Sequence, residues 1–79
     1  MNTKLNAAEA DAFTEMPLVT VYMPTHNRVE LLQRAVESVL TQTYENIELI
    51  IVDDKSTDST PEYLEAISKK DPRVRFFRN

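Results

Sequence analysis

The segment Ile47–Val52 constrains the fold of this chain more than any other part of the sequence. Its residues are apolar except for Glu48, and most are β-branched, which favours a strand over a helix in so short a run. A strand that is apolar on both sides is typical of a parallel sheet whose two faces are covered. Parallel strands in turn need crossover connections, which are usually helical. The segment therefore predicts an α/β fold.

Strands and helices are predicted to alternate around this segment. Residues 18–23 form a β-branched and aromatic run between two prolines and are predicted to be the first strand. Asn27 and Glu30 then form a capping-box pattern, and apolar residues follow it at helical spacing. These apolar residues are Leu31, Leu32, Ala35, Val36, Val39 and Leu40. We therefore expect a crossover helix between residues 18–23 and the segment Ile47–Val52.

The second half of the chain repeats this order. A helix is expected to begin near Asp58 or Thr60 and to stop before Pro72, because proline disfavours the helical conformation in the residue that precedes it. Residues 74–77 are predicted to be a third strand. The order β-α-β-α-β with right-handed crossovers predicts parallel strands in the order 3-2-1. We expect a three-layer fragment of a Rossmann-like fold.

The composition excludes several classes of function. A net charge of −4 and a pI near 4.8 argue against nucleic acid as a partner. The chain has no cysteine and one histidine, which leaves no thiolate or histidine cluster for a metal site. It also has no glycine, so neither the dinucleotide-binding fingerprint nor the phosphate-binding P-loop is present. Two common explanations for nucleotide binding are thereby removed.

The length and hydropathy of the chain predict one small domain. No stretch is apolar over the roughly 18–20 residues that span a bilayer, and residues 1–16 lack the apolar core of a signal peptide. We therefore expect no membrane span and a cytoplasmic location. Residues 1–16 are polar and alanine-rich, and we expect them to form a flexible N-terminal extension or a short helix. The domain itself is expected over residues 17–79.

Two polar loops follow the first two predicted strands, at the edge where open parallel sheets bind their ligands. The first loop, Pro24–Arg28, offers a hydroxyl, an imidazole and a guanidinium at the start of a helix, which suits an anionic or polar ligand. The second loop begins with Asp53 and Asp54, whose carboxylates can accept hydrogen bonds from a ring N–H or a ribose hydroxyl. We expect Asp58 to cap the following helix and Asp53 to order its own loop.

Together these segments resemble the N-terminal, nucleotide-binding part of family 2 glycosyltransferases, which are inverting enzymes of the GT-A fold. The resemblance covers about residues 17–79 and depends on several blocks that occur in the expected order and spacing. The blocks are residues 19–28, 31–32, 35–44, 48–54 and 56–58. The resemblance implies an incomplete glycosyltransferase domain that binds the nucleotide of a nucleotide-sugar donor, with a UDP-sugar as the expected ligand.

The resemblance also assigns roles to residues of the two loops. Asp54 matches the carboxylate that binds the base, and the first loop matches the segment that lines the base and ribose, with Pro24 contributing its backbone carbonyl. The predicted nucleotide-binding set is Pro24, Thr25, His26, Arg28, Asp53 and Asp54. His26 stands where many members have tyrosine, and it could contact the base by its face or its edge. Lys55 stands where glycine is common, which puts the geometry of the turn around Asp54 in doubt.

The main departure from the family is a set of missing motifs. Family members bind a divalent metal, Mg or Mn, through a DXD-like motif further along, and a later carboxylate serves as the catalytic base. The sequence has no Asp-X-Asp motif. We therefore expect no catalytic residue and no metal site in these 79 residues, and no sugar transfer by this chain alone.

Other functions remain open at this point. One is a non-catalytic fragment that binds nucleotide or serves in assembly. Another is a phosphoacceptor receiver domain, which is disfavoured because its acidic pair follows the first strand and here the pair follows the second. We also expect self-association through the uncovered edge of the first strand. The arginines at 73, 75 and 78 are expected to lie on one solvated strand face.

Overall fold

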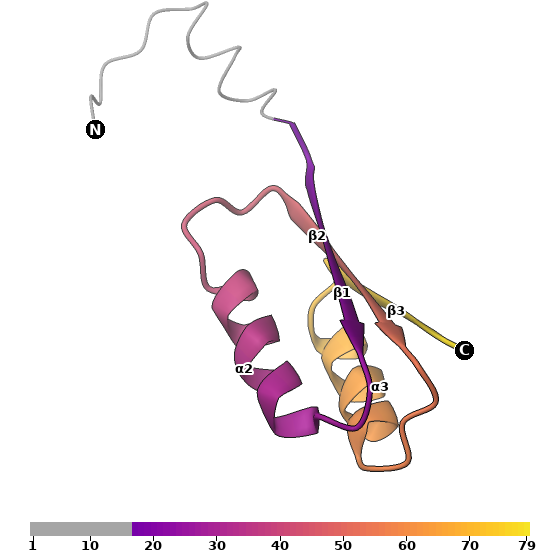
Figure 1. Ribbon diagram of the computed structural model, residues 1–79. Coiled ribbons are helices and arrows are strands. Elements are labelled where there is room, and N and C mark those ends of the chain that lie inside the picture. The colour runs from indigo at the N-terminus through magenta and orange to yellow at the C-terminus, as the bar shows by residue number, and fades with distance from the viewer. Residues whose placement is uncertain (1–16) are drawn as a thin grey trace, which may run out of the picture.

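The computed structural model describes residues 17–79, and the expected N-terminal extension lies outside the described residues. Two helices and three strands alternate along the chain (Figure 1). They are β1 (Val19–Thr25), α2 (Val29–Leu40), β2 (Ile47–Asp53), α3 (Thr60–Lys70) and β3 (Val74–Arg78). The predicted order of elements is confirmed. Neither helix in residues 17–79 has the length and apolar content that crossing a bilayer requires.

The three strands form one parallel sheet with β2 in its centre. The strand order is β1-β2-β3, which is the predicted order 3-2-1 counted from the opposite edge. Val19 of β1 pairs with Ile47, and Leu49 pairs with Val74 of β3. Both crossovers step in the same direction across the sheet. Because such crossovers are right-handed, both helices lie on the same face. The described residues thus form two of the three expected layers, one of strands and one of helices.

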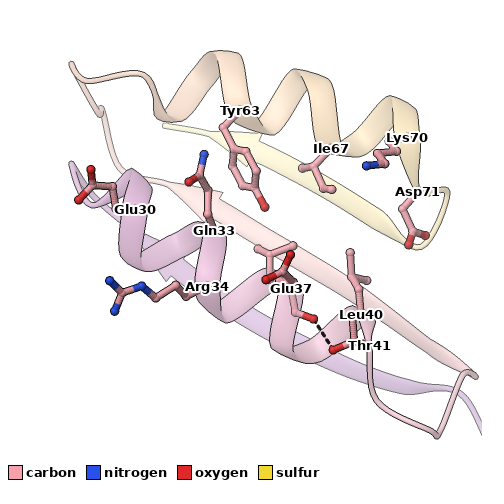
Figure 2. A pocket seen from close by; sticks show the side chains of 11 residues that line it. Glu30, Gln33, Arg34, Glu37, Leu40, Thr41, Tyr63, Ile67, Lys70 and Asp71 are labelled. Carbon is pink, nitrogen blue, oxygen red and sulfur yellow. Dashed lines mark hydrogen bonds between the residues drawn. The ribbon is translucent and has the colours of Figure 1, made fainter.

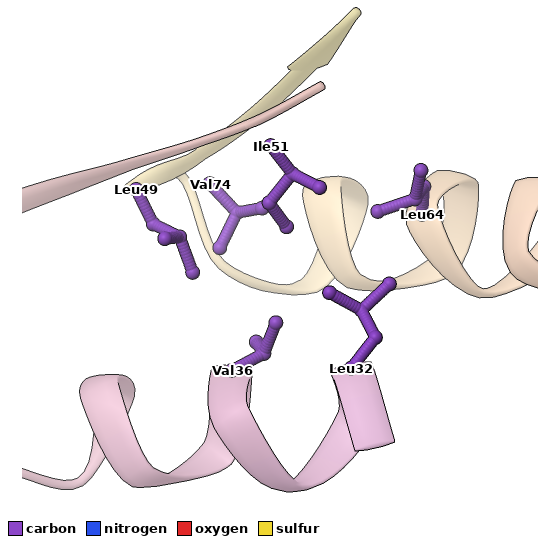
Figure 3. Packing of buried hydrophobic residues seen from close by; sticks show 6 residues of the cluster. All are labelled: Leu32, Val36, Leu49, Ile51, Leu64 and Val74. Carbon is purple, nitrogen blue, oxygen red and sulfur yellow. The ribbon is translucent and has the colours of Figure 1, made fainter. Parts of the chain in front are cut away.

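The hydrophobic core lies between the sheet and the two helices, and every element except β1 contributes a buried side chain to it. The buried cluster consists of Leu32 and Val36 of α2, Leu49 and Ile51 of β2, Leu64 of α3 and Val74 of β3. In Figure 3 these side chains converge from the strands and from both helices. The alternation of buried residues along β2 places Asp53 on the same face as Leu49 and Ile51.

The opposite face of the sheet is covered by no helix within residues 17–79. Its side chains include Tyr22 and Phe77, which are 63% and 52% exposed, beside the half-buried Ile50 and Val52. The two-sided covering expected for the segment Ile47–Val52 is therefore found on one side only. The reason is that both crossovers turn the same way.

The start of α2 differs from the predicted capping box. The helix begins at Val29, and neither Asn27 nor Glu30 makes the side-chain bonds of that motif. Instead, Asp58 accepts a hydrogen bond from the Val29 N–H at 3.2 Å, and its other carboxylate oxygen accepts one from the Thr60 N–H at 2.9 Å. One carboxylate therefore caps the N-termini of both helices, which confirms Asp58 as a cap and extends its role to α2.

Two residues without glycine's freedom adopt left-handed backbone conformations in the loops. Asn27 has φ 49° and Lys55 has φ 56°. Asparagine tolerates this region, whereas lysine enters it at a cost of roughly 1–2 kcal/mol. Lysine thus occupies the position in this turn where glycine is common, and its backbone adopts the positive φ that glycine enters freely.

We expect Lys55→Gly to raise the free energy of unfolding by about 0.5–1 kcal/mol. Relief of the left-handed penalty outweighs the larger conformational entropy that glycine gives to the unfolded chain. Urea denaturation at constant slope measures the change. Lys55→Ala is the control and should gain nothing, because alanine keeps the Cβ that causes the penalty. Equal stability of the glycine variant and the parent chain would contradict this explanation.

Candidate functional site

An open hollow of about 470 Å³ lies where β1 ends and α2 begins. Five of the six predicted nucleotide-binding residues line it, and these are Pro24, Thr25, His26, Arg28 and Asp54. Leu31, Leu32 and Ala35 of α2 add an apolar wall. We call this hollow the β1–α2 groove. It lies at the carboxyl edge of the sheet, where open parallel sheets bind ligands.

Hydrogen bonds between the two loops place Asp54 beside the groove. The N–H of Asp54 donates to the carbonyl of Thr25 at 2.9 Å, and His26 Nδ1 lies 2.5 Å from the carbonyl oxygen of Asp54. The backbone of Asp54 is thereby held against the loop after β1. Its carboxylate is exposed and receives no hydrogen bond or ion pair from residues 17–79. An acceptor thus remains available for a ligand.

Asp53 occupies a different environment from its neighbour. Its side chain is fully buried, and its carboxylate accepts hydrogen bonds from the Ser56 hydroxyl, from the Ser56 N–H at 3.4 Å and from Arg78 Nε at 3.1 Å. It does not line the β1–α2 groove. The structure therefore separates Asp53 from the other five predicted residues, and the expected ordering of the loop is the role that its contacts support.

The three arginines do not share one solvated face as expected. Arg73 forms an ion pair with Asp71 at 2.9 Å, and Arg75 lies 3.8 Å from Glu48 on the face without helices. Arg78 reaches the buried Asp53 from the opposite side of β3. The signal that could have shown this is the odd spacing of 75 and 78, which places them on opposite faces of a strand.

Asn27 is the residue of this region that the sequence pattern missed. Its side-chain oxygen accepts hydrogen bonds from the N–H groups of Thr57 at 2.7 Å and Asp58 at 3.2 Å. Its own N–H donates to the Ser56 hydroxyl at 2.8 Å. Asn27 therefore joins the loop after β1 to the loop after β2. The capping-box interpretation concealed this role, because it assigned the same side chain to its own helix.

The electrostatics of the loops favour an ionised Asp58. The nearby Thr60 hydroxyl, the Thr60 N–H and the Val29 N–H all hold the pKa of Asp58 below its ordinary value. The Thr60 hydroxyl is fully buried but has no hydrogen-bond partner within residues 17–79. The N–H groups of Val29 and Thr60, which donate to the carboxylate at 3.2 and 2.9 Å, are therefore the firmer cause of the lowered pKa.

This lowered pKa predicts a loss of stability in acid. A carboxyl group whose pKa is lowered by folding stabilises the fold at pH values above its unfolded pKa, which is about 3.9. That contribution is lost as the pH falls through the pKa of the folded state. The free energy of unfolding should therefore fall below about pH 4. The free energy of unfolding of the Asp58→Asn variant should fall less steeply over this pH range. The stability of this variant should still decrease somewhat in acid, because Arg73 holds the pKa of Asp71 low as well. Identical slopes for the parent and Asp58→Asn would contradict the assignment.

A larger hollow, of about 850 Å³, lies between α2 and α3 (Figure 2). Figure 2 shows Glu37 of α2 and Tyr63 and Ile67 of α3 beside it. Burial, together with the carboxylate of Glu37, raises the pKa of Tyr63. None of the predicted site residues lines this hollow. We place the candidate site in the smaller β1–α2 groove because it lies at the carboxyl ends of the strands.

The described residues contain no cluster of three side chains that could hold a divalent metal. Within residues 17–79 no three aspartate, glutamate or histidine side chains lie together as metal ligands would. The two acidic neighbours Asp53 and Asp54 point to different surroundings, one into the core and one to solvent. No chemical step is therefore assigned to a metal in this part of the chain.

Comparison with known proteins places this arrangement in a family. The model of the family described as "Glycosyl transferase family 2" matches residues 20–79. A putative colanic acid biosynthesis glycosyl transferase of Escherichia coli is 48% identical over 65 residues, covering 80% of this chain and 23% of that protein. A β-1,3-glucosyltransferase of Campylobacter jejuni, named for GalNAc(5)-diNAcBac-PP-undecaprenol, is 38% identical over 64 residues, covering 81% of this chain and 21% of that protein.

A solved structure agrees with the sequence relatives. The mannosyltransferase PcManGT from Pyrobaculum calidifontis, in complex with GDP-Man and Mn²⁺, superposes with a TM-score of 0.68 at 28% identity, covering 77% of this chain and 19% of that one. The chain thus spans about a fifth of the length of these proteins. Because the family model matches most of its residues and the fold agrees, this chain belongs to glycosyltransferase family 2.

Proposed function

We propose that this chain binds the nucleotide of a nucleotide-sugar donor in the β1–α2 groove, with UDP as the first candidate ligand. The observation that carries the proposal is the convergence of five predicted residues from two loops on one hollow at the carboxyl edge of the sheet. Family membership and the GDP-mannose bound by the structural neighbour support the same class of ligand.

The chemistry of the groove suits a nucleobase and its ribose. The exposed carboxylate of Asp54 can accept a hydrogen bond from a ring N–H, which uracil and guanine present and which cytosine lacks at the corresponding position. Arg28 brings a cation to the same hollow, beside the positive end of the α2 dipole. The apolar side chains of Leu31 and Ala35 give the base a surface to pack against.

Titration of the chain with UDP, followed by backbone amide chemical shifts, tests the proposal. We expect saturable changes at residues around the β1–α2 groove, above all His26, Arg28 and Asp54. Affinity of millimolar order is sufficient, and UDP and GDP should bind more tightly than CDP. Changes confined to the hollow between α2 and α3, or equal affinities for UDP and CDP, would contradict the assignment.

We further propose that the family's reaction, transfer of a sugar to an acceptor, is not performed by these 79 residues alone. The proposal is supported by the lack of an Asp-X-Asp motif in the sequence and by a carboxylate pair whose buried member is already committed to Ser56 and Arg78. Release of UDP from a UDP-sugar above a buffer control, with Mg²⁺ or Mn²⁺ present, would overturn it.

A second proposal concerns self-association through β1. This strand is at the edge of the described sheet, and Val19 and Tyr22 on it are 44% and 63% exposed. Exposed edges and apolar patches promote pairing with another chain. We therefore expect dimers or larger assemblies, and light scattering that shows a stable monomer at high concentration would count against them.

A further inference from the structure

The two ring nitrogens of His26 are both occupied by partners from the loops. Nδ1 lies 2.5 Å from the carbonyl oxygen of Asp54, and Nε2 lies 3.3 Å from the side-chain nitrogen of Asn27. A carbonyl oxygen can only accept a hydrogen bond, so Nδ1 must carry a proton to donate. The protonation of Nε2 depends on which atom of the Asn27 amide faces it.

The orientation of the Asn27 amide follows from its other contacts. Its oxygen accepts hydrogen bonds from the N–H groups of Thr57 at 2.7 Å and Asp58 at 3.2 Å. Both of these partners are donors, so the oxygen must face them and the NH₂ group must face His26. An amide NH₂ group can only donate, and Nε2 must therefore accept. The network admits only the neutral tautomer of His26 with its proton on Nδ1.

We propose that Asn27 is a positioning residue that holds His26 as the Nδ1–H tautomer, with no ring nitrogen left for a ligand. The remaining way for His26 to contact a bound molecule in the β1–α2 groove is through the face of its ring. That last step rests on the proposed nucleotide binding, whereas the tautomer does not. Asparagine is specifically required, because aspartate would keep the acceptor toward Thr57 and Asp58 and would place a second acceptor opposite Nε2.

Nitrogen-15 NMR of histidine-labelled chain tests the tautomer directly. His26 is the sole histidine, so its two ring nitrogens give unambiguous signals. At mildly alkaline pH we expect a protonated Nδ1 and an unprotonated Nε2. A proton on Nε2 in the parent chain, or rapid exchange between the two tautomers, would overturn the proposal without any variant being needed.

Two variants test whether Asn27 causes the preference. Asn27→Asp should place a proton on Nε2, alongside the Nδ1 proton that the Asp54 carbonyl requires or in exchange with it, in a chain whose amide spectrum remains that of the folded protein. Thr57→Ala is the matched control, since it removes only a 3.4 Å contact of the Thr57 hydroxyl to Asn27 and keeps the backbone donor. The control should keep the Nδ1–H tautomer. Retention of that tautomer in folded Asn27→Asp would remove the role assigned to Asn27.

Addition of UDP separates this inference from the proposed function. We expect the carbon-bound ring protons of His26 to shift as a base approaches the ring face, while the tautomer stays unchanged. A change of tautomer on binding would overturn the face contact. Failure of UDP to bind, with the Nδ1–H tautomer intact, would overturn the nucleotide proposal and the face contact and would leave the positioning role of Asn27 standing.

Discussion

Asp53→Ala is expected to lower the free energy of unfolding by about 2–4 kcal/mol, because it removes a fully buried carboxylate together with its hydrogen bonds. The Ser56 hydroxyl, the Ser56 N–H and Arg78 Nε all lose their acceptor. Ser56 is itself buried, so its groups cannot turn freely to water. Arg78 is 44% exposed, which keeps its share of the loss small. Such a loss is a large fraction of the stability of a chain of this size.

Urea denaturation measures this loss, and two further variants locate it. Asp53→Asn keeps the volume of the side chain and one acceptor oxygen. Its free energy of unfolding should therefore lie between those of the parent and the alanine variant. Arg78→Ala removes one partner and keeps the two Ser56 hydrogen bonds to Asp53, so it should cost less than Asp53→Ala. If Asp53→Ala were within 0.5 kcal/mol of the parent, a surface role for Asp53 would replace the structural one.

The fold could be predicted from sequence because its signals are periodic and local. The apolar run Ile47–Val52 marked the central strand, and the stripe that contains Leu32 and Val36 marked α2 and its buried side. The parallel order followed from the handedness of crossovers. The expected covering of both sheet faces was wrong, because right-handed crossovers that step in the same direction place both helices on one face.

The contacts that join the loops could not be predicted, because each joins residues far apart in the sequence. Asp58 caps α2 from 29 positions away, and Asn27 reaches Thr57 across 30 positions. Sequence reasoning placed both side chains with their nearest helix, which is the local alternative. The replacement of a common glycine by Lys55 predicted a change in this turn, but the backbone of Lys55 reaches a positive φ without glycine.

Five of the six predicted residues line one hollow, for a geometric reason. Parallel strands end at the same edge of the sheet, so the loops after β1 and β2 must meet. Asp53 was expected to order its own loop, yet it was kept with Asp54 in the predicted nucleotide-binding set, although adjacent residues at a strand end point to opposite sides. Asp53 follows the buried alternation of β2, and that pattern in the sequence could have assigned it to the core.

Asp54→Ala is expected to weaken UDP binding by about tenfold to a hundredfold while leaving the fold intact. A hydrogen bond to a charged group is worth roughly 1.5–3 kcal/mol, which corresponds to one to two decades in affinity. The side chain of Asp54 is exposed and receives no bond from residues 17–79, so its removal should cost little stability. Binding of CDP should change less, because cytosine lacks the ring N–H that the carboxylate accepts from.

Isothermal titration calorimetry of UDP on Asp54→Ala, beside Asp53→Asn as a folded control, tests the central claim of nucleotide binding at the carboxyl edge. Both variants keep Arg28 and His26, so a difference between them reports on the carboxylate pair alone. The assignment predicts that Asp54→Ala loses most of its affinity for UDP and that folded Asp53→Asn binds nearly as the parent does. Unchanged binding by Asp54→Ala, with weakened binding by a folded Asp53→Asn, would contradict it.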